Sequence, residues 1–375
     1  MSSFPFQVIV KPAGPVCNLQ CQYCFYLDKV NLYPKSDSLR MSPEILEQHI
    51  RHYLNEQPPD CPEVHFLWQG GEPTLMGIDF FQRAVNIQQR YAKHEIKISN
   101  SLQTNAVLID ESWAGFLKDQ NFLVGVSLDG PPELHDIFRR DKNGHPTSEK
   151  VLRGLKVLQK YEVDVNILTV VNNRNCFHPK KIYEYLKSIG ARFLQFIPLV
   201  EVIDGGVTNR SVDSLQFGRF LNGVLDEWKA GNDVGKIFVQ HFDLMLGLVM
   251  GYPASLCTHC RACGKGLVLE HNGDIYSCDH FVSADHKLGN IKKDTYTDVL
   301  NSCFQKKFGQ KKNVGLPNDC LACEYLKFCY GGCPKDRILS TAESERGLNY
   351  LCGGYKVFYS YASPIFHKMA ASIIY

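Results

Sequence analysis

The stretch VCNLQCQYCFY, residues 16–26, carries the strongest signal in the chain. It places Cys17, Cys21 and Cys24 in the spacing C-x3-C-x2-C, directly after a short apolar run at residues 6–10. Three thiolates this close together can hold three corners of a cubane iron–sulfur cluster, which normally takes four cysteines. The fourth iron is then open to a small-molecule ligand, as in a catalytic cluster. A zinc loop, or a cluster completed by a distant cysteine, is the alternative for this spacing.

Composition and charge restrict the classes of protein to which the chain can belong. Its 375 residues exceed the usual size of a single domain, so two domains are expected. A net charge of +2 gives no support to nucleic acid as a partner. The first residues, MSSFPFQVIVKPAGP, lack the basic and apolar regions of a signal peptide, and no stretch is long and apolar enough to span a bilayer. We therefore expect a cytoplasmic protein without membrane association.

Fifteen cysteines in a chain without a secretion signal favour metal binding over disulfides. Apart from the front group, most lie between Cys257 and Cys352, where a hairpin-like sequence with a turn at residues 272–273 also occurs. The clustered cysteines of this region are Cys257, Cys260, Cys263, Cys278, Cys320, Cys323, Cys329, Cys333 and Cys352. Such spacing is specific for metal, with zinc as an alternative to iron and sulfur. The cysteines outside the groups, Cys61, Cys176 and Cys303, are expected to be small hydrophobic residues.

Residues 1–200 alternate between strand and helix patterns. Strands are expected at residues 6–10, 64–68, 96–102, 122–128, 163–171 and 193–197. Helices between them are expected at residues 43–54, with Ser42 as N-cap, and at 80–91, 111–117, 149–161 and 179–189. Strands joined by helical crossovers form a parallel sheet, either open and doubly wound or a partial barrel. Helices at 213–229 and 238–250 precede a domain boundary near Pro253.

Further polar and glycine motifs lie at the ends of the expected strands, where parallel sheets place their binding sites. QGGEP, residues 69–73, follows the second strand, and its paired glycines let a backbone approach a ligand closely. Ser127 lies at the end of the fourth strand, and Arg139 follows within reach of a ligand carboxylate. Asp279 directly follows Cys278 and is a possible general base. On the residues alone, turn chemistry or a surface charge explains each of these motifs equally well or better.

The cysteine loop resembles the signature of the radical S-adenosylmethionine (radical SAM) superfamily, in which an aromatic residue, here Tyr23, precedes the last cysteine. The resemblance implies that the amine and carboxylate of SAM bind the fourth iron and that reduction yields a 5′-deoxyadenosyl radical. It also implies an α/β fold with a partial (β/α)6 TIM-like barrel. The SAM contacts that it implies are Tyr23, Gly71, Ser127, Arg139 with Arg140 as a register alternative, and Val200 near the adenine.

The C-terminal cysteine pattern resembles a SPASM domain, which holds two auxiliary [4Fe-4S] clusters in addition to the SAM-binding cluster. By position, the first auxiliary cluster takes Cys257, Cys263, Cys278 and Cys333. The second takes Cys320, Cys323, Cys329 and Cys352, and Cys260 is left over. The implied domains are a radical SAM barrel at 1–252, with linker helices from about residue 204, and a SPASM domain with a β-hairpin and helices at 253–375.

The finer resemblance is to anaerobic sulfatase-maturating enzymes. It is carried by KPAGPVCNLQCQYCFY (11–26), WQGGEPTL (68–75), SNSLQTNAVLIDESWAGFL (99–117), FLVGVSLDGP (122–131), FLQFIP (193–198) and SCDHF (277–281). It implies oxidation of a cysteine or serine to Cα-formylglycine within a C/S-x-P-x-R segment of an unfolded sulfatase. Asp279 would take the proton, and an electron would leave toward an auxiliary cluster. The implied partners are that sulfatase and an electron donor such as flavodoxin or ferredoxin, and a monomer is expected.

Two other functions are compatible with the same residues. The first is a SPASM enzyme that crosslinks another peptide, although such enzymes often carry an N-terminal peptide-clasping domain and Cys17 leaves no room for one. The second is a non-catalytic iron–sulfur or zinc protein, in which nothing depends on an open iron. Within the maturase interpretation, the sequence does not distinguish a cysteine target from a serine target.

Overall fold

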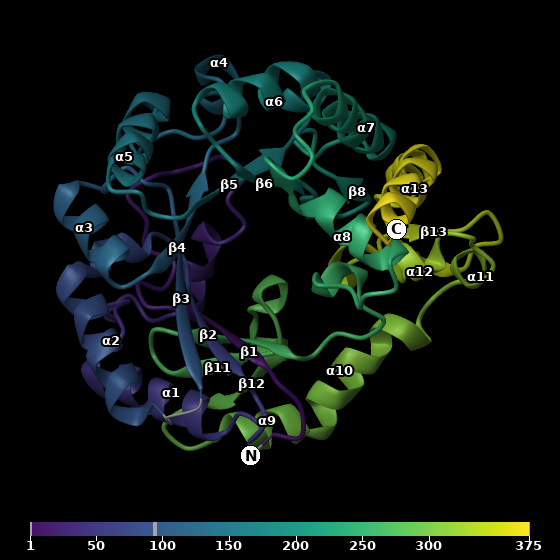
Figure 1. The fold of residues 1–375 in the computed structure, drawn as a ribbon. Coiled ribbons are helices and arrows are strands. Elements are labelled where there is room, and N and C mark those ends of the chain that lie inside the picture. The colour runs from purple at the N-terminus through teal and green to yellow at the C-terminus, as the bar shows by residue number, and fades with distance from the viewer. Residues whose placement is uncertain (1, 93–95, 375) are drawn as a thin grey trace. The chain divides into compact units, whose positions relative to one another are not determined.

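The computed structural model describes residues 2–92 and 96–374, and the chain divides into two compact units. The first unit comprises Met1–Ser127, Phe138–Val165 and Gly264–Gly309. The second comprises Leu128–Ile137, Asn166–Cys263 and Gln310–Tyr375. Each unit contains parallel strands with helices between them (Figure 1).

The sheet of the first unit has the strand order β12-β11-β10-β1-β2-β3-β4. Its strands are β1 (Gln7–Lys11), β2 (Glu63–Trp68), β3 (Lys97–Thr104), β4 (Phe122–Ser127), β10 (Gly266–Glu270), β11 (Asp274–Tyr276) and β12 (Lys287–Asn290). From β1 to β4 neighbouring strands are parallel, which confirms the prediction from the helical crossovers. The predicted hairpin is also present, because β10 and β11 pair antiparallel. Sequence analysis assigned this hairpin to the C-terminal domain, but β10 also pairs parallel with β1 and so extends this sheet.

Helices cover the outer side of strands β1 to β4 in the first unit (Figure 1). They are α1 (Pro43–Asn55), α2 (Ile78–Tyr91), α3 (Glu111–Asp119) and α5 (Ser148–Lys160), and α9 (Tyr296–Asn301) follows β12. The backbone N–H of Ile45 donates to the Ser42 hydroxyl, which confirms the predicted N-cap. Strand β3 continues two residues beyond the predicted apolar pattern, because its polar end pairs with β4 as far as Thr104.

In the second unit, β5 (Val165–Val171), β6 (Phe193–Pro198) and β9 (Phe238–Val239) pair in parallel. Sequence analysis predicted helix from residue 238, but α8 (Gln240–Val249) begins only after β9. Residues 238–239 form a strand because they pair with β6, where the rings of Phe193 and Phe238 stack with centroids 5.1 Å apart. The remaining strands are two short pairs, β7 (Val202–Ile203) with β8 (Gly206–Val207) and β13 (Leu339–Ser340) with β14 (Arg346–Leu348).

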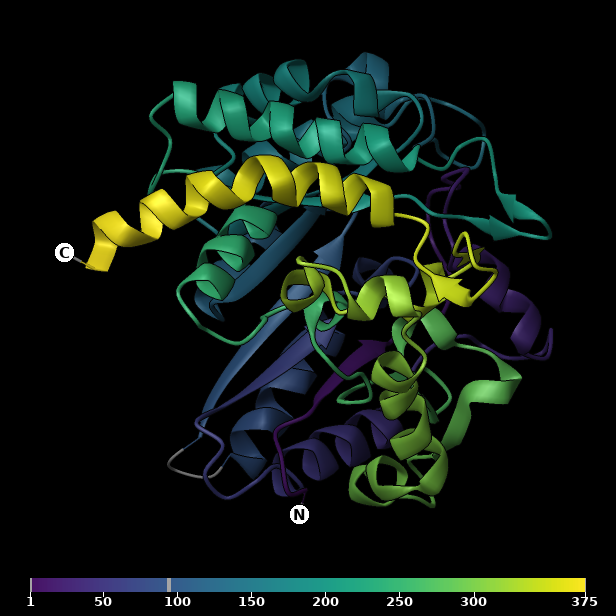
Figure 2. The same cartoon turned by 90° about the vertical axis from the view of Figure 1, so that its right-hand side faces the viewer.

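Helix α13 (Cys352–Ile374) lies against α7 (Ser214–Ala230) along much of its length (Figure 2). The two helices can approach closely because Gly218 of α7 faces Gly354 of α13, and a Cβ at either glycine would overlap the other helix's backbone. The other helices of this unit are α4 (Pro132–His135), α6 (Pro179–Ser188), α11 (Asn318–Leu321) and α12 (Leu326–Cys329). Helix α10 (Cys303–Val314) precedes α11 in the chain. Among the described residues, no helix is both long and apolar enough to cross a membrane.

The core of the first unit contains a neutral histidine, His49 of α1. Its Nδ1 atom lies 2.7 Å from the hydroxyl of Tyr296, and its ring stacks on Tyr53 with centroids 5.5 Å apart. Burial lowers the pKa of His49 to about 3. In the unfolded chain the same side chain takes up a proton near pH 6.5. The stabilisation that His49 contributes is therefore complete above that pH and is lost as the pH falls, because the unfolded chain binds the extra proton.

We expect the free energy of unfolding to fall with acidification below pH 6.5, with a contribution from His49 of up to about 1.4 kcal/mol per pH unit. His49→Phe fills the same site without titrating and should show a shallower slope. Urea unfolding followed by circular dichroism between pH 7 and pH 5 measures the difference. His367→Gln, which removes an exposed histidine of α13, is the control. Equal slopes for His49→Phe and the unaltered protein would contradict the assignment.

Candidate functional site

The cysteine loop of the first unit rests on the turn that follows β2. The backbone N–H groups of Gly71 and Glu72 donate to the carbonyls of Gly14 and Val16, each at 2.8 Å. A Cβ atom at Gly71 would overlap the Val16 carbonyl, so only glycine fits there. Sequence analysis explained the glycine by the approach of a ligand. In the structure, the backbone that approaches it is the cysteine loop itself.

A buried carboxylate, Glu72, anchors this turn to the end of β3. It accepts hydrogen bonds from the backbone N–H and the hydroxyl of Thr74, from the Thr104 hydroxyl and from the Asn105 N–H, at 2.6–3.0 Å. Burial raises the pKa of Glu72, whereas these donors favour its ionised form. Sequence analysis included Glu72 in the QGGEP motif but gave it no role. Its function is to tie two strand ends together beneath the cysteine loop.

The same network reaches the first cysteine of the loop. The amide of Asn105 donates to the Asn18 side chain at 2.7 Å and lies 3.7 Å from the Cys17 sulfur. The backbone N–H of Leu19 donates to the same sulfur at 3.4 Å. Donors directed at a ligand sulfur are one of the means by which proteins tune iron–sulfur clusters. Sequence analysis did not identify Asn18 or Asn105, because asparagines near turns are common and carry no spacing signal.

The segment of the loop from Cys21 to Cys24 lies beside residues 138–141. The Gln22 N–H donates to the Phe138 carbonyl at 3.0 Å, and the Tyr23 ring contacts the Phe138 ring with centroids 5.9 Å apart. The guanidinium carbon of Arg139 lies 5.4 Å from the centre of the Tyr23 ring. Arg140, the register alternative, donates to the Gly144 carbonyl in an exposed turn. Two of the predicted SAM contacts, Tyr23 and Arg139, therefore lie side by side at the cysteine loop.

The other predicted SAM contacts lie on different elements. Ser127 is the last residue of β4, and its hydroxyl accepts a hydrogen bond from Gln103 of β3 at 3.1 Å. Val200 is in the second unit, where it follows β6 and is buried. Its carbonyl accepts a hydrogen bond from Lys335 at 3.3 Å. Their roles as SAM contacts remain predictions.

The candidate base Asp279 forms an ion pair within the first unit. The Lys11 ammonium lies 2.6 Å from an Asp279 carboxylate oxygen and 4.3 Å from the centre of the Tyr26 ring. Burial raises the pKa of Asp279, but the charges of Lys11 and His280 outweigh it, so the pKa lies below its usual value. The Lys11 side chain is 2% exposed and that of Asp279 18%. Asp279 is therefore the more exposed member of the pair, and its oxygen nearest to Lys11 is buried.

A chain of buried polar groups continues from Lys11 toward the surface. The Tyr26 hydroxyl donates to Glu270, which pairs with Lys11 in the register of β1 and β10. The His271 ring lies between Glu270 and Asp37, 3.3 Å from a carboxylate oxygen of each. Sequence analysis did not identify these residues. They become neighbours only because β10 pairs with β1, and sequence spacing does not reveal that pairing.

The second unit contains a largely enclosed cavity lined by all four predicted ligands of the second auxiliary cluster. They are Cys320, Cys323, Cys329 and Cys352, accompanied by Leu326, Tyr355 and Tyr359. Burial raises the pKa of the Cys329 thiol to about 11, so a bound cluster has to displace its proton. Four thiols that line one cavity supply the set of ligands that a [4Fe-4S] cluster takes.

The predicted ligands of the first auxiliary cluster are divided between the units. Cys257, Cys263 and Cys333 belong to the second unit, and Cys278 follows β11 in the first. The Cys333 thiol has its pKa raised to about 12, chiefly by burial, and Cys257 is among the charges that act on it. Cys260, the cysteine that the resemblance leaves over, directs its sulfur to the carbonyls of Ala254 and Leu256, each at 3.4 Å.

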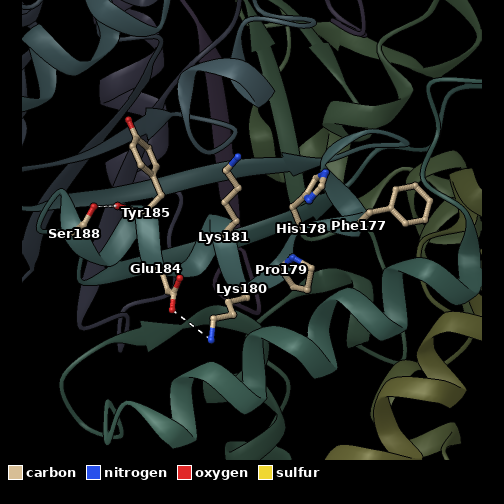
Figure 3. Close-up of a pocket in the computed structure, with 8 residues that line it drawn as sticks. All are labelled: Phe177, His178, Pro179, Lys180, Lys181, Glu184, Tyr185 and Ser188. Carbon is tan, nitrogen blue, oxygen red and sulfur yellow. Dashed lines mark hydrogen bonds and ion pairs between the residues drawn. The ribbon is translucent and has the colours of Figure 1, made fainter.

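A separate depression lies along α6 in the second unit (Figure 3). It is lined by surface side chains of this helix and the residues before it, among them Phe177, Lys181 and Tyr185, and Lys180 forms an ion pair with Glu184 at 3.6 Å. None of its lining residues is a predicted ligand or SAM contact. We assign it no part in the chemistry.

Two family models match the chain. The radical SAM superfamily matches residues 12–186, and an iron–sulfur cluster-binding domain, SPASM, matches residues 257–324. The chain is 41% identical to the serine-type anaerobic sulfatase-maturating enzyme of Bacteroides thetaiotaomicron, over 99% of this chain and 92% of that protein. It is 38% identical to the cysteine-type enzyme of Clostridium perfringens, over 98% of this chain and 99% of that protein.

The fold is similar to a solved structure described as native anSMEcpe with bound AdoMet and Cp18Cys peptide. The TM-score is 0.89 at 35% identity, over 98% of this chain and 99% of that one. Together with the family models, this match confirms the predicted α/β fold with radical SAM and SPASM domains.

Gly71→Ala is expected to displace the cysteine loop, because the added methyl group overlaps the Val16 carbonyl. The variant should lose the iron of the SAM-binding cluster, and with it the SAM-dependent change in the electron paramagnetic resonance (EPR) spectrum, while the auxiliary signals persist. Gly115→Ala is the matched control, because a Cβ there has room, with its nearest neighbour at 3.8 Å. Full iron content and an unchanged response to SAM in Gly71→Ala would disprove the packing argument.

Proposed function

Because the chain belongs to the anaerobic sulfatase-maturating enzymes, we propose that it oxidises a cysteine or serine in a C/S-x-P-x-R segment of an unfolded sulfatase to Cα-formylglycine. The observation in the structure that carries the proposal is the Lys11–Asp279 ion pair beside the cysteine loop. It supplies an ionised, partly exposed carboxylate next to Tyr26, which lies two residues beyond the cluster cysteine Cys24. Proton removal from a thiol or hydroxyl requires such a group.

The cofactors of the reaction are three [4Fe-4S] clusters and SAM. When bound, they supply a 5′-deoxyadenosyl radical that removes a hydrogen atom from the target Cβ. They also supply an acceptor for the electron that remains on the target. The fit of the chain to these groups rests on the cysteine loop and on the four thiols that share one cavity. We propose that Tyr23, Gly71, Ser127, Arg139 and Val200 contact SAM. Support for two of these comes from the position of Tyr23 and Arg139 at the loop.

We propose that Asp279 accepts the proton of the target thiol or hydroxyl. Lys11 keeps the carboxylate ionised and fixes its position. The Tyr26 ring contacts the Lys11 ammonium, and the Tyr26 hydroxyl donates to Glu270. Loss of one hydrogen atom, one proton and one electron converts serine directly to the aldehyde. Cysteine gives a thioaldehyde, which water hydrolyses with release of sulfide.

We also propose a role for each part of the chain, an electron donor and an oligomeric state. Residues 1–252 would carry the radical chemistry, and residues 253–375 the auxiliary clusters. An electron donor such as flavodoxin or ferredoxin would reduce the SAM-binding cluster in the cytoplasm, and the enzyme would act as a monomer. Size-exclusion chromatography with light scattering tests the monomer, and reduction of the clusters by purified flavodoxin tests the donor.

Incubation of the reconstituted protein with SAM, reductant and a sulfatase-motif peptide tests the function directly. The serine peptide should lose the mass of two hydrogens, and the cysteine peptide should change from thiol to aldehyde, as measured by anaerobic mass spectrometry. Unchanged peptides with SAM still cleaved to 5′-deoxyadenosine would reject the sulfatase substrate and retain a radical enzyme. Intact SAM in fully iron-loaded protein would reject the radical chemistry itself.

Asp279→Asn is expected to lower peptide oxidation by about a hundredfold or more, the usual contribution of a positioned base. Cleavage of SAM should continue, so that the ratio of formylglycine to 5′-deoxyadenosine falls. Lys11→Met should lower the same ratio by a smaller factor, because Asp279 then loses its positioning partner. Asp285→Asn removes an exposed carboxylate near the same hairpin and serves as the control. A normal ratio in Asp279→Asn would show that another group takes the proton.

A further inference from the structure

Two cations of the second unit, Lys312 and Arg337, have no role in the proposed chemistry. Lys312, near the end of α10, is fully buried, and Arg337 is partly buried. Within the described part of the chain, neither side chain forms an ion pair with a carboxylate. Burying a charged side chain costs several kcal/mol unless a partner compensates it. A source of negative charge near these two side chains would therefore offset the cost of burying them.

The surroundings of Lys312 identify that source. Its ammonium donates to the carbonyls of Cys257 at 2.6 Å and Thr258 at 2.9 Å, which fixes it beside a predicted ligand of the first auxiliary cluster. Burial lowers the pKa of Lys312, and the neighbouring thiols oppose this. The cysteines whose charge acts on Lys312 are Cys263, Cys257, Cys260 and Cys333. Three of these four are predicted ligands of the first auxiliary cluster.

Arg337 occupies the connection between the two auxiliary sites. Its guanidinium donates to the carbonyls of Tyr330 at 2.8 Å and Gly331 at 3.0 Å. These carbonyls belong to the short loop from Cys329, a predicted ligand of the second cluster, to Cys333, a predicted ligand of the first. The pKa of Arg337 is lowered by burial and raised by thiols of both predicted sites. A single cation is thus fixed on the loop that joins a predicted ligand of each cluster.

A cubane cluster with four thiolate ligands carries a net negative charge, which becomes more negative when the cluster accepts an electron. A fixed cation nearby stabilises the reduced form more than the oxidised form and so raises the reduction potential. Ligand type also sets this potential, but it is shared by all clusters with four cysteine ligands, whereas burial and nearby charge differ from site to site. The positions of Lys312 and Arg337 are particular to the auxiliary sites.

We propose that Lys312 raises the reduction potential of the first auxiliary cluster, that Arg337 raises the potentials of both, and that the two cations thereby fit these clusters to accept the electron from the oxidised target. The inference rests on the proposed function only for the direction of electron flow. The potentials themselves are properties of the loaded protein, so they can be measured without any peptide.

The test is an EPR-monitored redox titration of the full-length, fully iron-loaded protein. The auxiliary signals are distinguished from that of the SAM-binding cluster by their insensitivity to added SAM. Lys312→Met should make reduction of the first auxiliary cluster at least tenfold less favourable, a shift of about 59 mV to lower potential for a one-electron couple. Lys312→Arg retains the charge and should restore most of the shift. Lys311→Met is the matched control, because it removes an exposed lysine from the adjacent position of α10.

Arg337→Gln supplies an independent second test and should lower both auxiliary potentials, with Arg337→Lys restoring part of the shift. Unshifted potentials in iron-loaded Lys312→Met, or equal shifts in Lys311→Met and Lys312→Met, would overturn the proposal. If Lys312→Met fails to assemble its cluster, unshifted potentials in Arg337→Gln would overturn it instead. Failure of this inference leaves the peptide assay unaffected, and failure of peptide oxidation leaves the potentials measurable, so the two outcomes are distinguishable.

Discussion

The first unit depends on the contact between the cysteine loop and the turn after β2. The carbonyls of Gly14 and Val16 accept the N–H groups of Gly71 and Glu72, and no side chain larger than hydrogen fits at position 71. Leu19, Tyr23 and Tyr26 of the loop are buried, so apolar packing also holds it. The backbone hydrogen bonds and a buried carboxylate fix its position on the turn. This explains why a glycine pair and a glutamate are adjacent at the end of a central strand.

A second constraint is the pairing of β10 with β1. It carries the chain from the C-terminal cysteine region back into the sheet that begins the protein, so that Asp279 meets Lys11. A carboxylate on a surface loop would change its position relative to the cysteine loop whenever the surface loop moved. Here Lys11 ends β1 and Asp279 follows β11, two strands of one sheet that are separated by β10. The Tyr26 ring contacts the Lys11 ammonium, and the Tyr26 hydroxyl donates to Glu270.

Much of the fold and of the metal chemistry could be predicted from the sequence, because both depend on local patterns. Strand and helix periodicity located the alternating elements, and cysteine spacing located the metal regions. Ion pairs such as Lys11 with Asp279, and buried cations such as Lys312, could not be predicted this way. Their partners are distant in sequence, and a single lysine at a strand or helix end has no pattern. Residues 238–239 were predicted as helix because a strand of two residues is too short to give an alternating pattern, and only its pairing with β6 reveals it.

The position of Cys352 at the start of α13 has a consequence for biosynthesis. The other three cysteines that line its cavity lie between residues 320 and 329, whereas Cys352 is added later and begins the last helix of the chain. That helix packs on α7 through Gly218 and Gly354, next to the cysteine. A cluster bound by all four thiols therefore requires that the start of α13 be synthesised and docked before the fourth thiol is in place. A chain truncated before α13 would lack Cys352 and could hold such a cluster through three thiols only.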